Sequence, residues 1–207
     1  MTSSGGGWTL ISRFSNADSA NWMQYSGNWW YDRTSSYGSI TSPSSNSDMI
    51  SPAFWLVQGN NMRITRSDDV STYVETYGSC IGGISFRRFM ASFGNFRRGT
   101  IWNSNSCRGS CSARYGGNIG SVSAFSQFHC RSYHIGGNRR VSFWCDWSSG
   151  DGSVVMVGGG GSYCRRADHG IGITEAGSAQ FGTGNCDIDF GQDCSYTSSY
   201  SLNLWIN

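Results

Sequence analysis

Eight cysteines constrain the fold of this 207-residue chain more than any other feature of its sequence. They form an even set within the last two-thirds of the chain: Cys80, Cys107, Cys111, Cys130, Cys145, Cys164, Cys186 and Cys194. Zinc is the alternative to disulfides, but the sequence has no CxxC pair, and the CxxxC pair at Cys107 and Cys111 has no histidine at finger spacing. We therefore favour disulfides, which form in oxidising compartments.

The compartment and the domain count follow from length and patterning. No run of residues is long and apolar enough to span a membrane, and the N-terminus has no basic-then-apolar signal pattern. We expect a secreted, extracellular protein whose signal peptide has been removed. Only 14% of residues are charged and 29 are Gly, but 9 Trp, 10 Tyr and 11 Phe indicate a packed, turn-rich fold, and the length fits one domain.

Local patterns predict both strands and a helix. Strands are expected at 8–14, 54–57, 62–67, 139–147 and 153–157, with the second and third paired around the turn QGNN. Residues 87–96 are the best candidate for a short helix. In the segment 200–207, Leu202, Leu204 and Ile206 alternate with Asn203, Trp205 and Asn207, which predicts a strand that closes the sheet. The fold class expected from these elements is α+β with a loop-rich C-terminal half.

Charge is distributed unevenly along the chain. Residues 76–145 carry nine arginines and no acid, whereas residues 146–207 carry two arginines and seven acids, and lysine is absent. One interpretation is that the basic middle and the acidic end pair with each other. The other is a guanidinium-lined face beside an acidic, cation-binding loop region. Arg87-Arg88, Arg97-Arg98 and Arg139-Arg140 are the densest basic positions.

Four consecutive glycines at 158–161 follow the apolar run at 154–157. A phosphate-binding loop of the nucleotide-binding kind needs a lysine, and the chain has none. Flexible linkers lack the apolar and cysteine anchors that flank these glycines. We therefore expect a structured loop in which the backbone passes where a side chain does not fit.

Sequence signatures of catalysis are weak. The chain contains neither H-E-x-x-H nor G-x-S-x-G, although a Ser-His-Asp arrangement of distant residues stays open. Asp187 and Asp189 lie two apart and share one face if extended, and metal ligation is favoured for them over catalysis, with a solvated strand edge as the alternative. We predict that the protein is not an enzyme.

Several segments resemble the fibrinogen-like superfamily and its intelectin-like, invertebrate extracellular branch. They are GGGWTLISRF, MISPAFWLV, SFWCDW, GDGSVVMVGGGG and RADHGIGITEA. The resemblance implies one fibrinogen-like (intelectin-like) domain over residues 1–207, with small twisted antiparallel sheets, short helices and a disulfide-stapled C-terminal half. The calcium motif and the Gly-Gly-Trp-Trp segment of fibrinogen itself are absent, so its pocket is not carried over.

The resemblance also implies a calcium-dependent lectin. The stretch GDGSVVMVGGGG places Asp151 close to a family ligand position, and Asp168, His169 and Glu175 match by type and vicinity. The predicted calcium ligands are Asp146, Asp151, Asp168, Glu175, Asp187 and Asp189. His169, Trp147 and Tyr163 are the predicted sugar-binding residues, with a structural hydrogen bond as the alternative for His169 and core packing for Trp144 and Trp147.

Two disulfides are predicted from local arguments. Cys145 and Cys164 both follow strand-like segments, and a bridge between them would fix the glycine loop, a region in which the resembling family also carries a disulfide. Cys186 and Cys194 would close a short local loop. The other four cysteines allow three pairings, among which the sequence does not choose.

The leading functional hypothesis is a secreted calcium-dependent carbohydrate-binding protein, and the alternative is a structural or adhesive matrix protein without a glycan site. Glycans, acidic ones included, are the expected partners. We expect no nucleic-acid partner and no membrane span, and we expect a homo-oligomer.

Overall fold

The described part of the chain is built mainly from β-strands. The computed structural model describes residues 7–15, 30–71, 73–94, 106–116, 140–146, 152–157, 170–174 and 200–207. Nine strands form one sheet and two short strands form another, while the helices α1 (Ala53–Leu56) and α2 (Phe86–Ala91) have four and six residues. The predicted α+β, fibrinogen-like fold class is therefore wrong, because one large antiparallel sheet replaces the expected small sheets.

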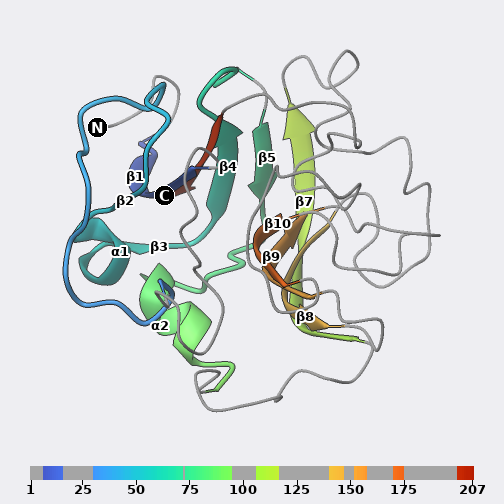
Figure 1. Ribbon diagram of the computed structural model, residues 1–207. Coiled ribbons are helices and arrows are strands. Elements are labelled where there is room, and N and C mark those ends of the chain that lie inside the picture. Colours follow the sequence, from blue (N-terminus) through green and yellow to red (C-terminus); the bar gives the residue numbers. More distant parts are fainter. Residues whose placement is uncertain are drawn as a thin grey trace.

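The large sheet is curled, and its neighbouring strands are antiparallel (Figure 1). Its strand order is β10-β9-β8-β7-β5-β4-β11-β1-β2. The strands are β1 (Thr9–Ser15), β2 (Met49–Ile50), β4 (Met62–Arg66), β5 (Tyr73–Thr76), β7 (Ser106–Gly116), β8 (Arg140–Asp146), β9 (Gly152–Val157), β10 (Gly170–Thr174) and β11 (Ser201–Ile206). The small sheet pairs β3 (Gln58–Gly59) with β6 (Ile84–Ser85).

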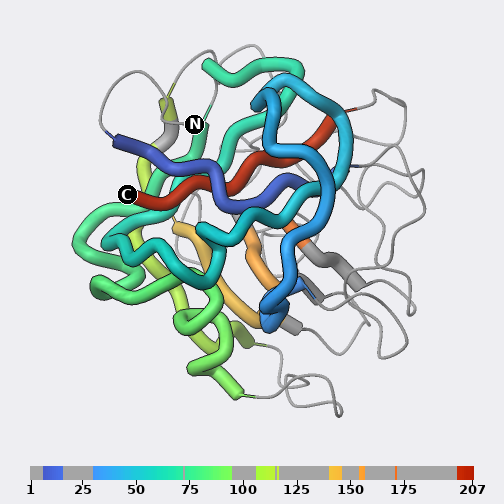
Figure 2. Tube along the Cα trace, turned by 90° about the vertical axis from the view of Figure 1, so that its left-hand side faces the viewer, coloured from blue at the N-terminus to red at the C-terminus, as the bar shows by residue number. Residues whose placement is uncertain are grey.

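Strand β11 lies inside the sheet, between β4 and β1. Leu204 pairs with Ile64 on one side and with Ser12 on the other, and Figure 2 shows the blue β1 and the red β11 side by side. The predicted strand and its alternation are confirmed, but the strand does not close the sheet. Both of its edges are paired, and both of its faces are covered, so all six of its residues are buried.

Strand β7 connects the two parts of the sheet. Its residues 113–116 pair with β5, and its residues 106–112 pair with β8. This division explains why β7 is 11 residues long. The two ends of β7 therefore lie beside different groups of strands, about 33 Å apart along the strand at about 3.3 Å per residue.

One face of the sheet packs against the two helices through an aromatic core. The Trp30 ring centroid lies 5.9 Å from that of Phe54 in α1 and 6.2 Å from that of Phe86 in α2. Phe89 of α2 contacts Phe143 of β8, with 4.9 Å between the centroids. Burying each such side chain stabilises the fold by about 1.5–3 kcal/mol, so this cluster fixes the helices on the sheet.

The helix prediction at 87–96 is confirmed in part by α2, which ends at Ala91, whereas the strand prediction at 54–57 is wrong. Pro52 has helical backbone angles, and the Val57 N–H donates to the Ala53 carbonyl (3.0 Å), so residues 53–56 form one helical turn. The strand predicted at 62–67 is β4, and it pairs with β5 and β11 rather than with residues 54–57. Neither α1 nor α2, the helices of the described ranges, is long and apolar enough to cross a membrane.

Trp144 interrupts the side-chain alternation of β8. Its φ is 50°, a value that bulky residues rarely adopt. Phe143 and Trp144 consequently both join the main core, although successive strand residues normally point to opposite faces. The Trp144 ring is fully buried, contacts Tyr31 and donates from Nε1 to the Met90 carbonyl (3.2 Å). Core packing, the alternative interpretation of this tryptophan, is confirmed.

A polar loop covers part of the other face of the sheet. We call residues 38–48 the covering loop. The buried Arg13 guanidinium donates to the carbonyls of Ser39 (2.9 Å), Ser42 (2.6 Å) and Ser47 (2.6 Å), and to the Ser47 hydroxyl (2.9 Å). Burial lowers the pKa of Arg13 from its ordinary value, and the charge of Asp48 offsets part of this effect.

Polar side chains of β11 and a backbone N–H of β1 hold the same loop at further points. The Asn203 amide donates to the Pro43 carbonyl (2.6 Å), and the Ser201 hydroxyl donates to the Ser45 carbonyl (2.8 Å). The Ser15 N–H donates to the Asp48 carboxylate (2.7 Å). The covering loop is thus bound to the sheet by hydrogen bonds rather than by apolar packing.

Candidate functional site

Most of the predicted site residues lie outside the described residues. Asp146 is the last residue of β8, and it alone of the predicted calcium ligands falls within the described ranges. The predicted residues outside these ranges are Trp147, Asp151, Tyr163, Asp168, His169, Glu175, Asp187 and Asp189. Their roles stay predictions.

The strand pairing defines one end of the sheet as a meeting point of chain segments. Asp146 pairs with Ser106 of β7 and with Gly152, the first residue of β9. Gly152 also pairs with Thr174, the last residue of β10. The end of β8, the start of β9 and the end of β10 are therefore adjacent, within two strand spacings of about 4.8 Å each. We call this the 146–152–174 end.

A disulfide joins two strands at the 146–152–174 end. Cys107 and Cys145 are directly opposite each other in the β7–β8 register and are bonded. The predicted Cys145–Cys164 bridge is therefore wrong, because the strand register gives Cys145 a different partner. Cys164, Cys186, Cys194 and Cys130 lie outside the described residues, so the Cys186–Cys194 pairing stays a prediction.

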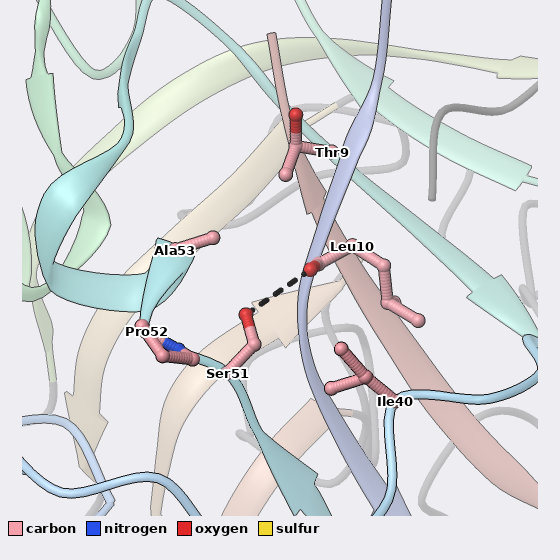
Figure 3. Close-up of a pocket in the computed structure, with 6 residues that line it drawn as sticks. All are labelled: Thr9, Leu10, Ile40, Ser51, Pro52 and Ala53. Atoms are coloured by element: carbon pink, nitrogen blue, oxygen red, sulfur yellow. Dashed lines mark hydrogen bonds between the residues drawn. The ribbon is translucent and has the colours of Figure 1, made fainter.

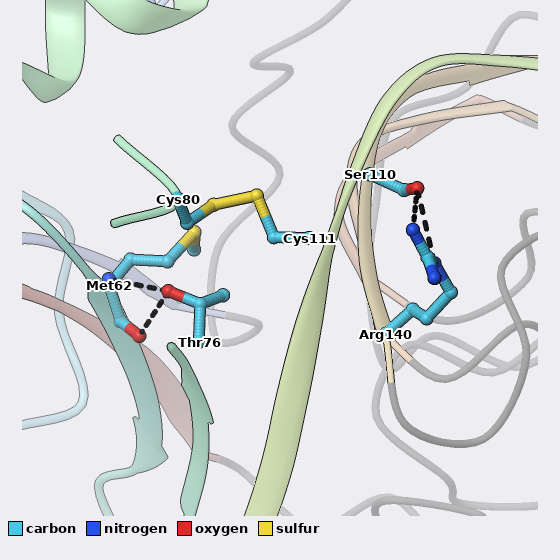
Figure 4. Close-up of a disulfide and its surroundings, with 6 residues drawn as sticks. All are labelled: Met62, Thr76, Cys80, Ser110, Cys111 and Arg140. Carbon is cyan, nitrogen blue, oxygen red and sulfur yellow. Dashed lines mark hydrogen bonds between the residues drawn. A yellow bond between two sulfur atoms is a disulfide. The ribbon is translucent and has the colours of Figure 1, made fainter. Parts of the chain in front are cut away.

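The second disulfide links Cys80 to Cys111 of β7, with 5.6 Å between their Cα atoms. Both cysteines pack against the main core. Figure 4 shows this bridge on one side of β7 and the side chains of Ser110 and Arg140 on the other. The two bridges are consistent with an extracellular protein.

Among the residues that the structure describes, no group of three or more His, Cys, Asp or Glu side chains is arranged to hold a metal ion. A pocket of about 200 Å³ lies between β1 and the start of α1 (Figure 3). Its lining has no ionisable side chain, and its Ser51 hydroxyl donates to the Leu10 and Ile11 carbonyls (both 3.3 Å). The pocket therefore offers neither an acid-base pair nor an activated nucleophile.

An ionic cluster lies on the sheet face opposite the aromatic core. The Glu75 carboxylate, 6% exposed, accepts from Arg63 through Oε2 (2.9 and 2.5 Å) and from Arg114 through Oε1. The Arg63 guanidinium lies between the rings of Trp8 and Tyr73, 4.5 Å from each centroid. The hydrogen bond to Glu75 raises the pKa of Arg114 from its ordinary value.

Exposed arginines alternate with serines along the outer side of β7. Ala113 and Cys111 face the main core, so Arg108, Ser110, Ser112 and Arg114 face the opposite side by strand alternation. Arg140 of β8 pairs with Ser112, and its Nε (3.1 Å) and Nη2 (2.7 Å) donate to the Ser110 hydroxyl. The sequence predicted a basic face in this region but did not single out Arg108 and Arg114.

The other arginines of the basic segment behave differently. Arg87 of α2 donates from Nε to the Asp32 carbonyl (3.0 Å), and Arg88 is exposed on the same helix. Arg97, Arg98 and Arg139 lie outside the described residues. Arg114 binds Glu75, whereas the pairing interpretation proposed partners among the acids of residues 146–207.

Neither the protein-family models nor the curated protein sequences contain a match to this chain. The resemblance of its motifs to fibrinogen-like and intelectin-like domains therefore stays a prediction.

Proposed function

We propose that the protein is a secreted, non-catalytic glycan-binding protein that holds calcium, and through it a sugar, at the 146–152–174 end of the sheet. The observation that carries the proposal is the pairing of Asp146 with Gly152 and of Gly152 with Thr174. In the sequence, Asp151 directly precedes β9 and Glu175 directly follows β10. Three acids are thus at, or one residue from, three adjacent strand ends.

The donor chemistry fits a hard cation. Calcium takes six to eight oxygen ligands at about 2.3–2.6 Å and accepts them from separate chain segments. Asp146, Asp151 and Glu175 would supply carboxylate oxygens to such a site. Bound calcium would offer coordination positions to neighbouring hydroxyls of a sugar.

The Cys107–Cys145 disulfide supports a site at this end. It cross-links β7 and β8 one residue before Asp146, and Cys145 is fully buried. A binding site holds its geometry better when its ligands come from constrained strand ends than from free loops. The bridge also makes the site depend on an oxidising compartment, in agreement with a secreted protein.

The test combines thermal unfolding with a glycan array. Calcium at about 100 times its dissociation constant should stabilise the native state by about 2.7 kcal/mol and raise the Tm, whereas magnesium should have a smaller effect. Glycan binding should be lost in excess chelator. The triple variant Asp146→Asn, Asp151→Asn, Glu175→Gln should lose both responses.

Asp69→Asn is the matched control. Asp69 lies in the β4–β5 connection, beside the opposite end of β7, where it accepts from the Ser71 N–H (3.1 Å). This variant should keep the calcium-induced rise in Tm and the array signal. A wild-type protein that shows neither a calcium response nor any array signal would contradict the proposal and favour the structural or adhesive alternative.

A further inference from the structure

The arginines on the outer side of β7 and β8 form an extended cationic surface. We call Arg108, Arg114 and Arg140 the arginine strip. All three side chains are exposed, and that of Arg114 is 65% exposed. Arg108 and Arg114 lie six residues apart on one strand, about 20 Å, and Arg140 lies between them opposite Ser112. A row of this length suits a linear polyanion better than a single small anion.

The described side chains of this face carry more positive than negative charge. Glu75 lies on this face, because its single carboxylate forms ion pairs with both Arg63 and Arg114. Among the described side chains of this face, Arg63 and the arginine strip carry four positive charges, and Glu75 carries one negative charge. The buried carboxylate anchors Arg114 without neutralising the strip.

Two of the three guanidinium groups are held through the same pair of nitrogen atoms, Nε and Nη2. Arg114 uses Nε and Nη2 for Glu75, and Arg140 uses Nε and Nη2 for the Ser110 hydroxyl. The Nη1 atom of each side chain takes no part in these hydrogen bonds and can donate to a bound anion. Because the Ser110 hydroxyl accepts from Arg140, its own proton is available for a further acceptor. Arginines held in this way lose less side-chain entropy when an anion binds.

We propose that the arginine strip binds a sulfated glycan chain across β7 and β8, independently of calcium. Guanidinium groups form strong, directional hydrogen bonds with sulfate oxygens. The disulfides favour an extracellular location, in which sulfated polysaccharides rather than nucleic acids are the available polyanions. The side chains of the strip and its intervening positions are arginine and serine, and the nearby rings of Trp8 and Tyr73 already hold the Arg63 guanidinium between them rather than offering a platform for stacked bases.

The test measures binding of heparin, desulfated heparin and an oligonucleotide of matched charge over a series of salt concentrations. Heparin affinity should fall steeply with salt, because exposed charges are screened over about 10 Å at 0.1 M. Desulfated heparin and the oligonucleotide should bind more weakly. Heparin binding should persist in chelator and in the triple carboxylate variant, so failure of the calcium proposal would leave this result intact.

The variants are chosen to leave the buried Glu75 paired. Arg108→Gln with Arg140→Gln should weaken heparin binding about tenfold and reduce its salt dependence, as expected for the loss of two exposed ionic contacts. Arg33→Gln with Arg88→Gln removes the same charge outside the strip and should leave binding unchanged; circular dichroism checks that each variant is folded. Equal affinity for desulfated heparin, tighter oligonucleotide binding, or equal losses in the two double variants would overturn the proposal.

Discussion

Replacing Arg13 by methionine should release the covering loop from the sheet. Arg13 is fully buried in β1 and donates four hydrogen bonds to Ser39, Ser42 and Ser47. Methionine fills a similar volume but donates none. Three loop carbonyls would then lose their partner at the surface of the sheet.

The size of the effect follows from two opposing contributions. A hydrogen bond to a charged group contributes about 1.5–3 kcal/mol, so four of them give about 6–12 kcal/mol before other costs are counted. Removing a guanidinium from water costs several kcal/mol, a cost that methionine avoids. We expect a net loss of about 3–5 kcal/mol in the free energy of unfolding, which is a large part of the stability of an ordinary domain.

Urea unfolding and hydrogen exchange measure the two expected consequences. The free energy of unfolding should fall by the amount above, and the backbone amides of residues 38–48 should exchange faster. The ranking of hydrogen-exchange rates between the amides of β11 and those of the other strands should be the same as in the wild type. Arg13→Lys, which keeps the charge but loses the planar fork, should cost less, about 1–3 kcal/mol, and provides a folded variant if methionine is not tolerated.

Arg88→Met is the control, because Arg88 is exposed on α2 and surface substitutions change stability by about 0.5 kcal/mol or less. If Arg13→Met matched this control in both stability and loop exchange, the covering loop would not depend on Arg13.

Three further variants test a disulfide, a close backbone approach and a buried hydrogen bond. Cys80→Ser with Cys111→Ser opens a loop of 31 residues and should lower the free energy of unfolding by about 3–4 kcal/mol, which urea unfolding would measure. Gly59→Ala should cost about 1–3 kcal/mol, because the added Cβ would meet the Asn207 carbonyl; a variant as stable as wild type would contradict this close approach. Trp144→Phe removes the hydrogen bond to the Met90 carbonyl and should cost about 1–2 kcal/mol, seen as a lower Tm.

The sequence predicts those elements whose apolar residues are large and regularly spaced. In β11, Leu202, Leu204 and Ile206 alternate, and this pattern identified the strand. The apolar run at 54–57 fits a strand and a helical turn equally well. The helical turn forms because it buries Phe54 in the main core. Strand β7 was not predicted, because its inward residues are Gly109, Cys111 and Ala113, which are too small to give a hydrophobic period.

Local sequence patterns do not reveal which residues pair with each other across the sheet. Cys145 was assigned to Cys164 because both follow strand-like segments and a bridge between them would fix the glycine loop, whereas the strand register pairs Cys145 with Cys107. The basic segment was visible from composition, but only the alternation of β7 separates its outward arginines from the rest. Likewise, three adjacent strand ends bring Asp146 near Gly152 and Thr174, a relation that depends on topology alone.

The position of β11 has a consequence for the order of folding. Ribosomes synthesise β1 and β4 long before β11, yet each of them needs β11 as a hydrogen-bonded neighbour. Until residues 201–206 emerge, both strands present unpaired edges, which are the usual starting points of aggregation. The contact between Thr9 and Ile206 also spans nearly the whole chain, so its closure is slow. The large sheet therefore cannot be completed before residues 201–206 have emerged, and holdase chaperones should increase the yield more than slower synthesis would.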